Sequence, residues 1–546
     1  MGICYTADTP IRVAHLGITS VISLVDDGLL EEYRLAYAER LGLDLGSPQT
    51  TRIGRIRSYL DFVADEVERK FTRLCAERFD GGSDKDLYFL MLPQDSCLRV
   101  EYDRVMSKTG IARIAAEASL TGKMEPGGIQ ANIMVGLNHE EAAFDAVRGF
   151  AASKVSGALV LSAGVNLSVF EEIAKCKDFY RTSACSPKKK IILKVSDYRS
   201  ALIQGRYLAK KGLEVYEYRI ESGVNCGGHA FFETKKLLLD VVREFIERRE
   251  ELFETTRAMI AKAGCVPPSS PARITAQGGL CSPEDIEKIM SLGIDGVGVG
   301  TPFLLVPQAT SVDKETRRLL ISATPDDVYI SHASPLGFPF INLRISTAAE
   351  LCRKKVQEYF RPQSEKSGNP ELKPGFPCRQ HYLCRPIPGF DHPVCMASRE
   401  YVMHRLAEID ELEKEEMESH AALDPSTSLR MTVDEIRAKY DMLRRETLER
   451  ECICRFLGNA GREEIREKSP SIHYQPECVA VARGSRPART GDPVTICPNP
   501  DIGYFDREYT LFEMMRHLYG TGPRLTPNDK PSAFEVEERM LKNALL

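Results

Sequence analysis

This sequence carries its strongest structural signal in two segments, Ile274-Thr275-Ala276-Gln277-Gly278-Gly279-Leu280 and Gly293-Ile294-Asp295-Gly296-Val297-Gly298-Val299-Gly300-Thr301-Pro302-Phe303. The pattern predicts two buried strands, Arg273–Ala276 and Gly296–Val299, and each ends in glycine. A helix between them has a start signal in Ser282-Pro283-Glu284-Asp285, with a capping serine, an early proline and acids in the first turn. Glycines at two successive strand ends let backbone N–H groups approach an anion closely.

Outward from this unit, strand-like and helix-like runs alternate between residues 10 and 345. Continuous apolar strands that alternate with helices indicate a parallel sheet buried on both faces. The strand candidates are Ile11–Leu16, Ser20–Val25, Gln130–Val135, Ala158–Ser162, Ile191–Val195, Val215–Ile220, Arg273–Ala276 and Gly296–Val299. The helical runs are Glu140–Ser153, Ser168–Cys176, Tyr198–Lys211, Thr234–Ala263 and Ser282–Leu292. Eight strands fit an α/β fold of the (β/α)8 TIM-barrel class, in which Asp86–Leu92 could replace the second candidate.

Two regions fall outside this alternation, so we expect a barrel over residues 1–345 and a second region over residues 346–546. Residues 26–128 are too long for one connection and predict a helical insertion, with helical periodicity in Arg55–Cys75. It could cover the active site or form a subunit contact. The C-terminal region is rich in cysteine and predicts helices at Glu400–Ala422, Thr432–Cys452 and Asp506–Tyr519, the first two as a hairpin.

Composition excludes several classes of function. With a net charge of −5, the chain has no excess of basic residues to bind a nucleic acid. No stretch approaches the roughly 18 apolar residues of a membrane-spanning helix. The N-terminus has no signal-peptide pattern, so we expect a cytoplasmic protein whose 16 cysteines do not form disulfides.

A histidine follows one of the predicted strands at the position where barrel enzymes place catalytic groups. Strand Val215–Ile220 continues into Glu221-Ser222-Gly223-Val224-Asn225-Cys226-Gly227-Gly228-His229. Imidazole transfers protons near neutral pH, so His229 is a candidate catalytic residue at the carboxyl end of that strand. A histidine that simply caps the next helix is the structural alternative.

These motifs together resemble the nitronate monooxygenase family, formerly called 2-nitropropane dioxygenases, which are FMN-dependent TIM barrels. The resemblance rests on Gly227-Gly228-His229, Gln277-Gly278-Gly279, Gly298-Val299-Gly300-Thr301 and Ser334-Pro335-Leu336-Gly337-Phe338-Pro339, in the order of that family. It covers about residues 190–345 well and residues 10–165 less well, where Thr9–Ala14 resembles the family's first strand. The flavin-type enoyl-acyl-carrier-protein reductases and the enoyl reductase component of polyunsaturated fatty acid synthases belong to the same superfamily.

The resemblance implies a role for each matching residue. FMN would be the cofactor, with Gly278, Gly279, Gly300 and Thr301 at its phosphate and Asn132 and Lys194 near its ring. Gly227 and Gly228 would let the backbone pass close to the cofactor, and His229 would transfer a proton.

The segment before the histidine departs from the family pattern, because the stretch from Glu221 to His229 is longer than the family's usual form. This departure affects the expected identity of the substrate more than the expected binding of flavin. We expect oxidation of a small nitronate-like substrate. There are three alternatives: an NAD(P)H-dependent reductase of enoyl thioesters, a quinone reductase, and a non-catalytic assembly protein on a degenerate barrel. The pair Glu221-Ser222 resembles the corresponding pair of the enoyl reductases. Association into a homo-oligomer stays open.

The C-terminal cysteines form two groups that suit thiolate ligands for zinc or an iron–sulfur cluster. Neither spacing matches a common metal-binding pattern, and buried thiols are the preferred interpretation. The candidates are Cys378, Cys384, Cys395, Cys452, Cys454 and Cys497.

Overall fold

The structure is a computed structural model. It describes residues 6–134, 140–162, 164–182, 186–223, 236–331, 334–366, 369, 372–377, 382–422, 431–456, 462, 465, 494–496 and 498–545.

Seven parallel strands form one sheet, and each strand pairs with the next one along the chain. A sequential parallel order with helices in the connections is the winding of a TIM barrel, so the predicted fold class is confirmed. The strands are β1 Ser20–Ser23, β2 Ile129–Met134, β3 Ala158–Ser162, β4 Lys190–Val195, β5 Glu217–Glu221, β6 Arg273–Gln277 and β7 Gly296–Gly298.

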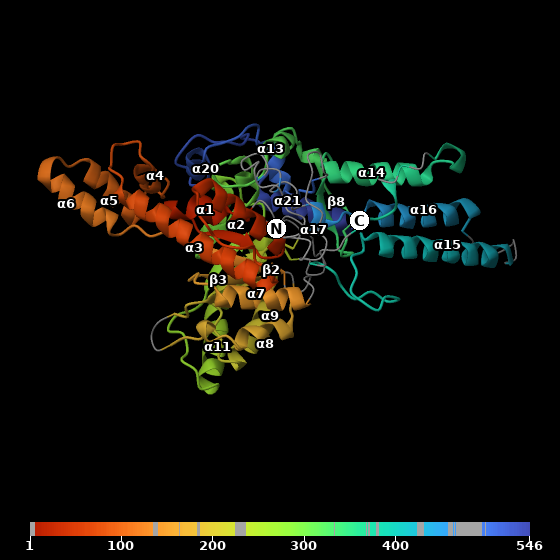
Figure 1. Ribbon diagram of the computed structural model, residues 1–546, viewed down its shortest axis with the longest axis horizontal. Helices are drawn as coiled ribbons and strands as arrows, with labels where there is room; N and C mark the ends of the chain where they lie inside the picture. Colours follow the sequence, from red (N-terminus) through yellow and green to blue (C-terminus); the bar gives the residue numbers. More distant parts are fainter. Residues whose placement is uncertain are drawn as a thin grey trace.

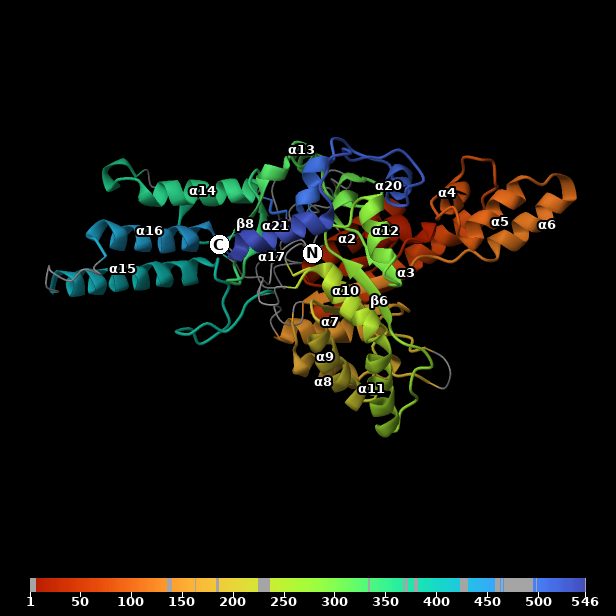
Figure 2. The same cartoon turned by 180° about the vertical axis from the view of Figure 1, so that it is seen from behind.

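Helices cover the outer face of this sheet, most of them at the lower centre of Figure 1 and, seen from behind, of Figure 2, with α12 above the others in Figure 2. They are α7 Glu140–Ala152, α8 Leu167–Ala174, α9 Tyr198–Lys210, α10 Leu238–Glu247, α11 Arg249–Lys262 and α12 Pro283–Met290. Helix α12 begins as predicted, since Ser282 accepts a hydrogen bond from the N–H of Asp285. The single helix predicted over Thr234–Ala263 is two helices, because α10 packs on β5 and β6 whereas α11 packs on α9.

The strand predicted at Ile11–Leu16 is wrong. These residues form helix α1 Thr9–Val13 and the 3-10 turn η1 Ala14–Leu16. Pro10 stands in the first helical turn, where its fixed φ favours a helix, and Gly17 ends the segment with a φ of 82°. The substitute strand Asp86–Leu92 is also wrong, because it lies mostly in helix α4 Asp84–Leu90. Over the described residues the parallel sheet therefore has seven strands instead of eight.

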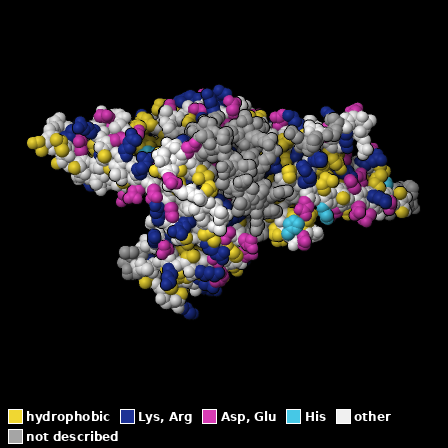
Figure 3. Space-filling view, in the orientation of Figure 1, with side chains coloured by type: hydrophobic (Ala, Val, Ile, Leu, Met, Phe, Trp, Pro, Cys, Tyr) yellow, Lys and Arg dark blue, Asp and Glu magenta, His cyan; other side chains and the backbone are white. Residues whose placement is uncertain are grey.

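The insertion after β1 is helical, as predicted. Besides α4, its helices are α2 Asp27–Leu41, α3 Arg52–Ala76, α5 Cys97–Met106 and α6 Gly110–Thr121. Helix α3 packs along α7, and a Cβ added at Gly149 would lie 2.8 Å from Ile56 Cγ2, so this glycine permits the close approach. Helices α4 to α6 project from the body as an arm on the left of Figure 1. Apolar side chains lie exposed at the end of this arm in Figure 3. On α6, Ile111 is 87% exposed.

A second arm, on the right of Figure 1, comes from the C-terminal region. It contains α14 Thr347–Phe360 and the predicted helical hairpin, α15 Arg399–Ala422 and α16 Val433–Glu449. The capping box of Thr432 and Glu435 is present at the start of α16. Between the sheet and this arm lies an antiparallel pair of strands, β8 Val328–Ser331 and β9 Phe340–Leu343. The remaining elements include α13 Lys314–Ile321, α17 Ile453–Phe456 and the 3-10 turns Lys177–Phe179, Pro325–Asp327 and Gln363–Glu365.

The last part of the chain returns to the body. It forms the 3-10 turn η8 Pro500–Tyr504, α20 Leu511–Leu518 and α21 Ala533–Leu545. The helix predicted from Asp506 begins only at Leu511, where Thr510 and Glu513 form a capping box. One apolar core contains residues from Ala7 to Phe534, so the tail and the barrel pack together. The division at residue 346 stays a prediction. None of the helices among the described residues is both long and apolar enough to span a membrane.

Candidate functional site

Strand register places a row of polar residues on the inward face of the sheet. Residues paired across parallel strands point to the same face, and Glu221 pairs with Gln277, which pairs with Gly298. Lys194, two residues beyond Ile192 on β4, lies on this face too. The opposite face, which includes Leu193 and Ile220, is buried in the apolar core under the helices.

At the carboxyl ends of β4, β5 and β6 these residues form a chain of contacts. Lys194 Nζ lies 2.8 Å from Glu221 Oε1, and Gln277 Nε2 donates to the same oxygen at 2.8 Å. The side chains of Lys194 and Glu221 are 12% and 18% exposed, so the ion pair is only partly open to water. Lys194 was predicted from the sequence, whereas Glu221 and Gln277 were not predicted as site residues. Their position as the last residues of adjacent parallel strands is the signal that could have found them.

Below this pair the interior is filled by a second polar layer. Arg219 Nη2 donates to Glu217 Oε1 at 2.6 Å and to Gln130 Oε1 at 2.9 Å. Thr275 Oγ1 donates to Glu217 Oε1 at 2.6 Å, and Glu217 is 1% exposed. These groups satisfy one another's hydrogen bonds below the Lys194–Glu221 ion pair.

The two glycines after β6 have backbone conformations that side chains disfavour. The φ angles are 131° at Gly278 and 71° at Gly279. Gly279 is buried, and within the described part of the chain its N–H donates no hydrogen bond. A buried N–H group needs an acceptor, and an anionic oxygen supplies one.

The neighbouring strand β7 ends in a second open turn. Gly300 precedes the 3-10 turn η4 Thr301–Leu305, and a Cβ added there would meet no heavy atom within 4 Å. Thr301 Oγ1 accepts a hydrogen bond from the N–H of Asn499 at 3.1 Å and keeps its own hydrogen for another acceptor. Because β6 and β7 pair directly, the two turns lie side by side. Two adjacent glycine turns of this kind are suited to an anionic group.

Asn132, the other predicted ring contact, lies on β2. It is half-buried on the inward face and pairs with Ser23 and Val160. It is thus two strands away from Lys194 and shares the same interior. The predicted catalytic residue His229, with Gly227 and Gly228, lies outside the described residues.

The cysteine candidates separate into different packing environments. Cys384, Cys395 and Cys452 lie in one small apolar cluster with Cys352, whereas Cys454 belongs to the main core. Burial raises the pKa of the Cys352 thiol well above its usual value. Cys378 and Cys497 lie outside the described residues. In the part of the chain that the structure describes, no group of three or more His, Cys, Asp or Glu side chains could hold a metal.

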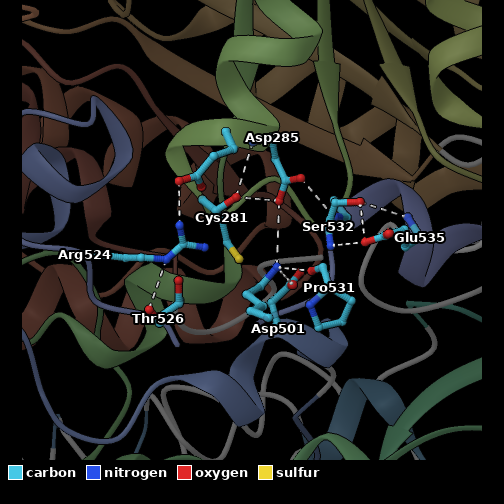
Figure 4. Close-up of polar contacts among 12 residues, drawn as sticks. Cys281, Asp285, Asp501, Arg524, Thr526, Pro531, Ser532 and Glu535 are labelled. Atoms are coloured by element: carbon cyan, nitrogen blue, oxygen red, sulfur yellow. Dashed lines mark hydrogen bonds and ion pairs between the residues drawn. The ribbon is translucent and has the colours of Figure 1, made fainter. Parts of the chain in front are cut away.

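Behind the β6 turn lies a buried cluster that sequence analysis missed (Figure 4). Lys530 Nζ lies 3.0 Å from Asp501 Oδ1 and 3.8 Å from Asp285 Oδ2, and the three side chains are at most 3% exposed. Burial raises the pKa of the adjacent Cys281 thiol well above its usual value, so it stays protonated. Burial also raises the pKa of Asp501, against the opposing effect of Lys530. The cluster attaches the C-terminal tail to the helix that follows the glycine turn.

No protein-family model matches this chain, and no curated protein does either. Solved structures do match. The enoyl reductase domain of MlnA from the macrolactin biosynthesis cluster of Bacillus amyloliquefaciens is similar at 13% identity and a TM-score of 0.37, over 81% of this chain and 88% of that one. FabK from Thermotoga maritima is similar at 17% identity and a TM-score of 0.28, over 48% and 70%. Nitroalkane oxidase from Streptomyces ansochromogenes is similar at 12% identity and a TM-score of 0.26, over 45% and 66%. At these values the similarities assign no activity to this chain.

Proposed function

We propose that this chain is an FMN-dependent oxidoreductase. The observation that carries the proposal is the pair of adjacent glycine turns after β6 and β7, with the buried N–H of Gly279 and the open space at Gly300. Gly278, Gly279, Gly300 and Thr301 would hold the phosphate through backbone N–H groups and one hydroxyl. FMN, when bound, supplies electron or hydride transfer.

The side chains at the mouth would orient the ring and handle protons. Lys194 offers a cation at the carboxyl end of β4, and its pairing with Glu221 holds that cation in one place. Asn132 would contact the ring from β2. His229, carried over from the resemblance to nitronate monooxygenases, would hold or move the substrate's proton.

For the reaction we propose oxidation of a small nitronate-like substrate. The second candidate is NAD(P)H-dependent reduction of an enoyl thioester, which the sequence pair Glu221-Ser222 favours, or of a quinone. The two differ in the electron source, because only the second consumes a reduced pyridine nucleotide.

The deciding experiment is a visible absorption spectrum of protein purified without oxygen, with metal analysis of the same sample. We expect flavin bands and about one FMN per chain. Nitronates, enoyl thioesters and quinones are then assayed with and without NADH or NADPH. A colourless protein that cannot be reconstituted with FMN contradicts the proposal and favours a non-catalytic assembly role. Iron in the sample would instead point to a cluster on the C-terminal cysteines.

A further inference from the structure

The last segment of the chain, residues 498–545, contacts the carboxyl ends of three consecutive strands. After β7, the N–H of Asn499 donates to Thr301 Oγ1. After β6, His517 Nε2 lies 3.1 Å from the carbonyl oxygen of Cys281. The N–H of Leu525 donates to His517 Nδ1, so Nε2 carries the hydrogen and donates to that carbonyl. The third contact, after β5, is made by Glu537.

Glu537 lies on α21 and is 2% exposed. Its Oε1 accepts a hydrogen bond from Ser222 Oγ at 2.5 Å. Its two oxygens also accept from the N–H of Leu238, at 3.1 and 2.9 Å. Leu238 is the first residue of α10, and Leu237 before it has no side-chain oxygen that could cap the helix. The Glu537 carboxyl therefore caps α10 from a distant helix.

This contact bears directly on the mouth of the barrel. Ser222 follows Glu221, whose carboxylate binds Lys194 and Gln277. We propose that Glu537 is a positioning residue of the flavin site, which holds the end of β5 and the start of α10 so that Glu221 keeps Lys194 in place. This inference rests on the proposed function, and the C-terminal tail then belongs to the site.

The contact needs an oxygen acceptor more than it needs a charge. Burial raises the pKa of Glu537, and the nearby Asp240 acts in the same direction. A glutamine can accept from Leu238 through its carbonyl oxygen and donate its amide to Ser222 Oγ. Glu537→Gln should thus preserve the geometry that Glu537→Ala removes. Glu538→Gln is the matched control, because Glu538 is the adjacent residue and its side chain is 52% exposed.

The first measurement is hydrogen–deuterium exchange of the protein without added FMN. In Glu537→Ala we expect peptides that cover 217–222 and 236–247 to exchange roughly tenfold faster or more, since a buried acceptor has been lost. Peptides from α15 should be unchanged, and Glu537→Gln and Glu538→Gln should match the wild type. Unchanged exchange in Glu537→Ala overturns the inference. Should Glu537→Ala fail to fold, Ser222→Ala removes one of the two contacts and must raise exchange at 217–222.

The second measurement is made on the FMN-loaded protein. We expect Glu537→Ala to shift the flavin absorbance bands and to lower turnover by about tenfold to a hundredfold, and Glu537→Gln to restore both. A wild-type flavin spectrum and turnover in Glu537→Ala, with only a lower melting temperature, would reduce Glu537 to a structural role. If the wild type binds no FMN, the proposed function fails. The exchange data then still decide whether Glu537 holds the end of β5 and the start of α10.

Discussion

Gly279 combines a left-handed backbone with burial at the predicted phosphate site. We expect Gly279→Asp to abolish FMN retention, because it adds a Cβ at a φ of 71° and a carboxylate where an anion would bind. The measurement is the ratio of flavin to protein absorbance after gel filtration. Gly264→Asp is the control, since Gly264 has a φ of 76° with nothing within 4 Å of an added Cβ. A fully flavinated Gly279→Asp protein would show that the phosphate lies elsewhere.

His229 is the residue to which the sequence assigns proton transfer. We expect His229→Ala to keep FMN and to lose about two orders of magnitude or more in turnover, the usual scale for an acid–base group. His392→Ala is a suitable control, because His392 is an exposed histidine whose pKa is raised mainly by its hydrogen bond to Asp391. Steady-state assays of both variants against the active substrate test the role. Equal turnover in His229→Ala and the wild type would contradict a role of His229 in proton transfer.

Lys189 is a buried cation whose side chain caps the C-terminal end of helix α7. Its Nζ donates to the carbonyl oxygens of Phe150, Ser153 and Val155, at 2.7 to 2.8 Å. Lys189→Met leaves these acceptors without a donor, so we expect a loss of about 3 kcal/mol in the free energy of unfolding. Urea denaturation followed by circular dichroism measures it.

The same lysine makes stability depend on pH. Burial lowers the pKa of Lys189 from 10.5 to about 8. Between these values the unfolded chain binds more protons than the folded one, so the free energy of unfolding rises with pH across that window. Lys189→Met cannot titrate there. The difference in stability between wild type and Lys189→Met should therefore grow from pH 8 to pH 10.5, and a constant difference would contradict the assignment.

Single helices of this protein are largely determined by local signals. Thr432 with Glu435, and Ser282 with Pro283, mark helix starts in the sequence, and the structure begins helices there. Capping requires only residues a few positions apart, which is why it could be predicted. The strand expected at Ile11–Leu16 failed because its apolar residues suit either structure, and Pro10 was the signal that favoured a helix.

Helix α21 should depend on its cap in the same way. Ser532 Oγ accepts from the N–H of Glu535 at 3.2 Å, and the Glu535 carboxylate accepts from the N–H of Ser532 at 2.8 Å. We expect Ser532→Ala to destabilise this helix by about 1 kcal/mol and to weaken FMN retention through Glu537. Thr432→Ala removes an equivalent cap from α16, in the distant arm, and should leave flavin content unchanged. Equal flavin content in the two variants would contradict a role of α21 in FMN binding.

Over the whole molecule, the tail completes the core of the barrel. Ile502, Phe505 and Met514 are at most 2% exposed and pack in the main apolar core. We expect a chain that ends at residue 497 to aggregate or to melt at a much lower temperature, because burying these side chains stabilises the fold by about 2 kcal/mol each. Thermal unfolding and flavin content measure the effect.

The helical hairpin of the second arm offers the control for that truncation. Ile409, Ile436 and Tyr440 form a small cluster of their own, separate from the main core. Replacing residues 410–439 with a short Gly/Ser linker should preserve the melting temperature of the body and its flavin. A truncated tail that leaves the protein as stable as this variant would contradict the role of the tail.

The sequence by itself determined the alternation of strands and helices, the helix caps and the paired glycine turns, because each depends on residues close together in the chain. Only the tertiary structure decided that Glu221 meets Lys194 and Gln277, since this contact depends on strand register. It also decided that Glu537 reaches Ser222, 315 residues away. No local pattern predicts such a pair, because burial of a distant helix against the barrel brings the two residues together.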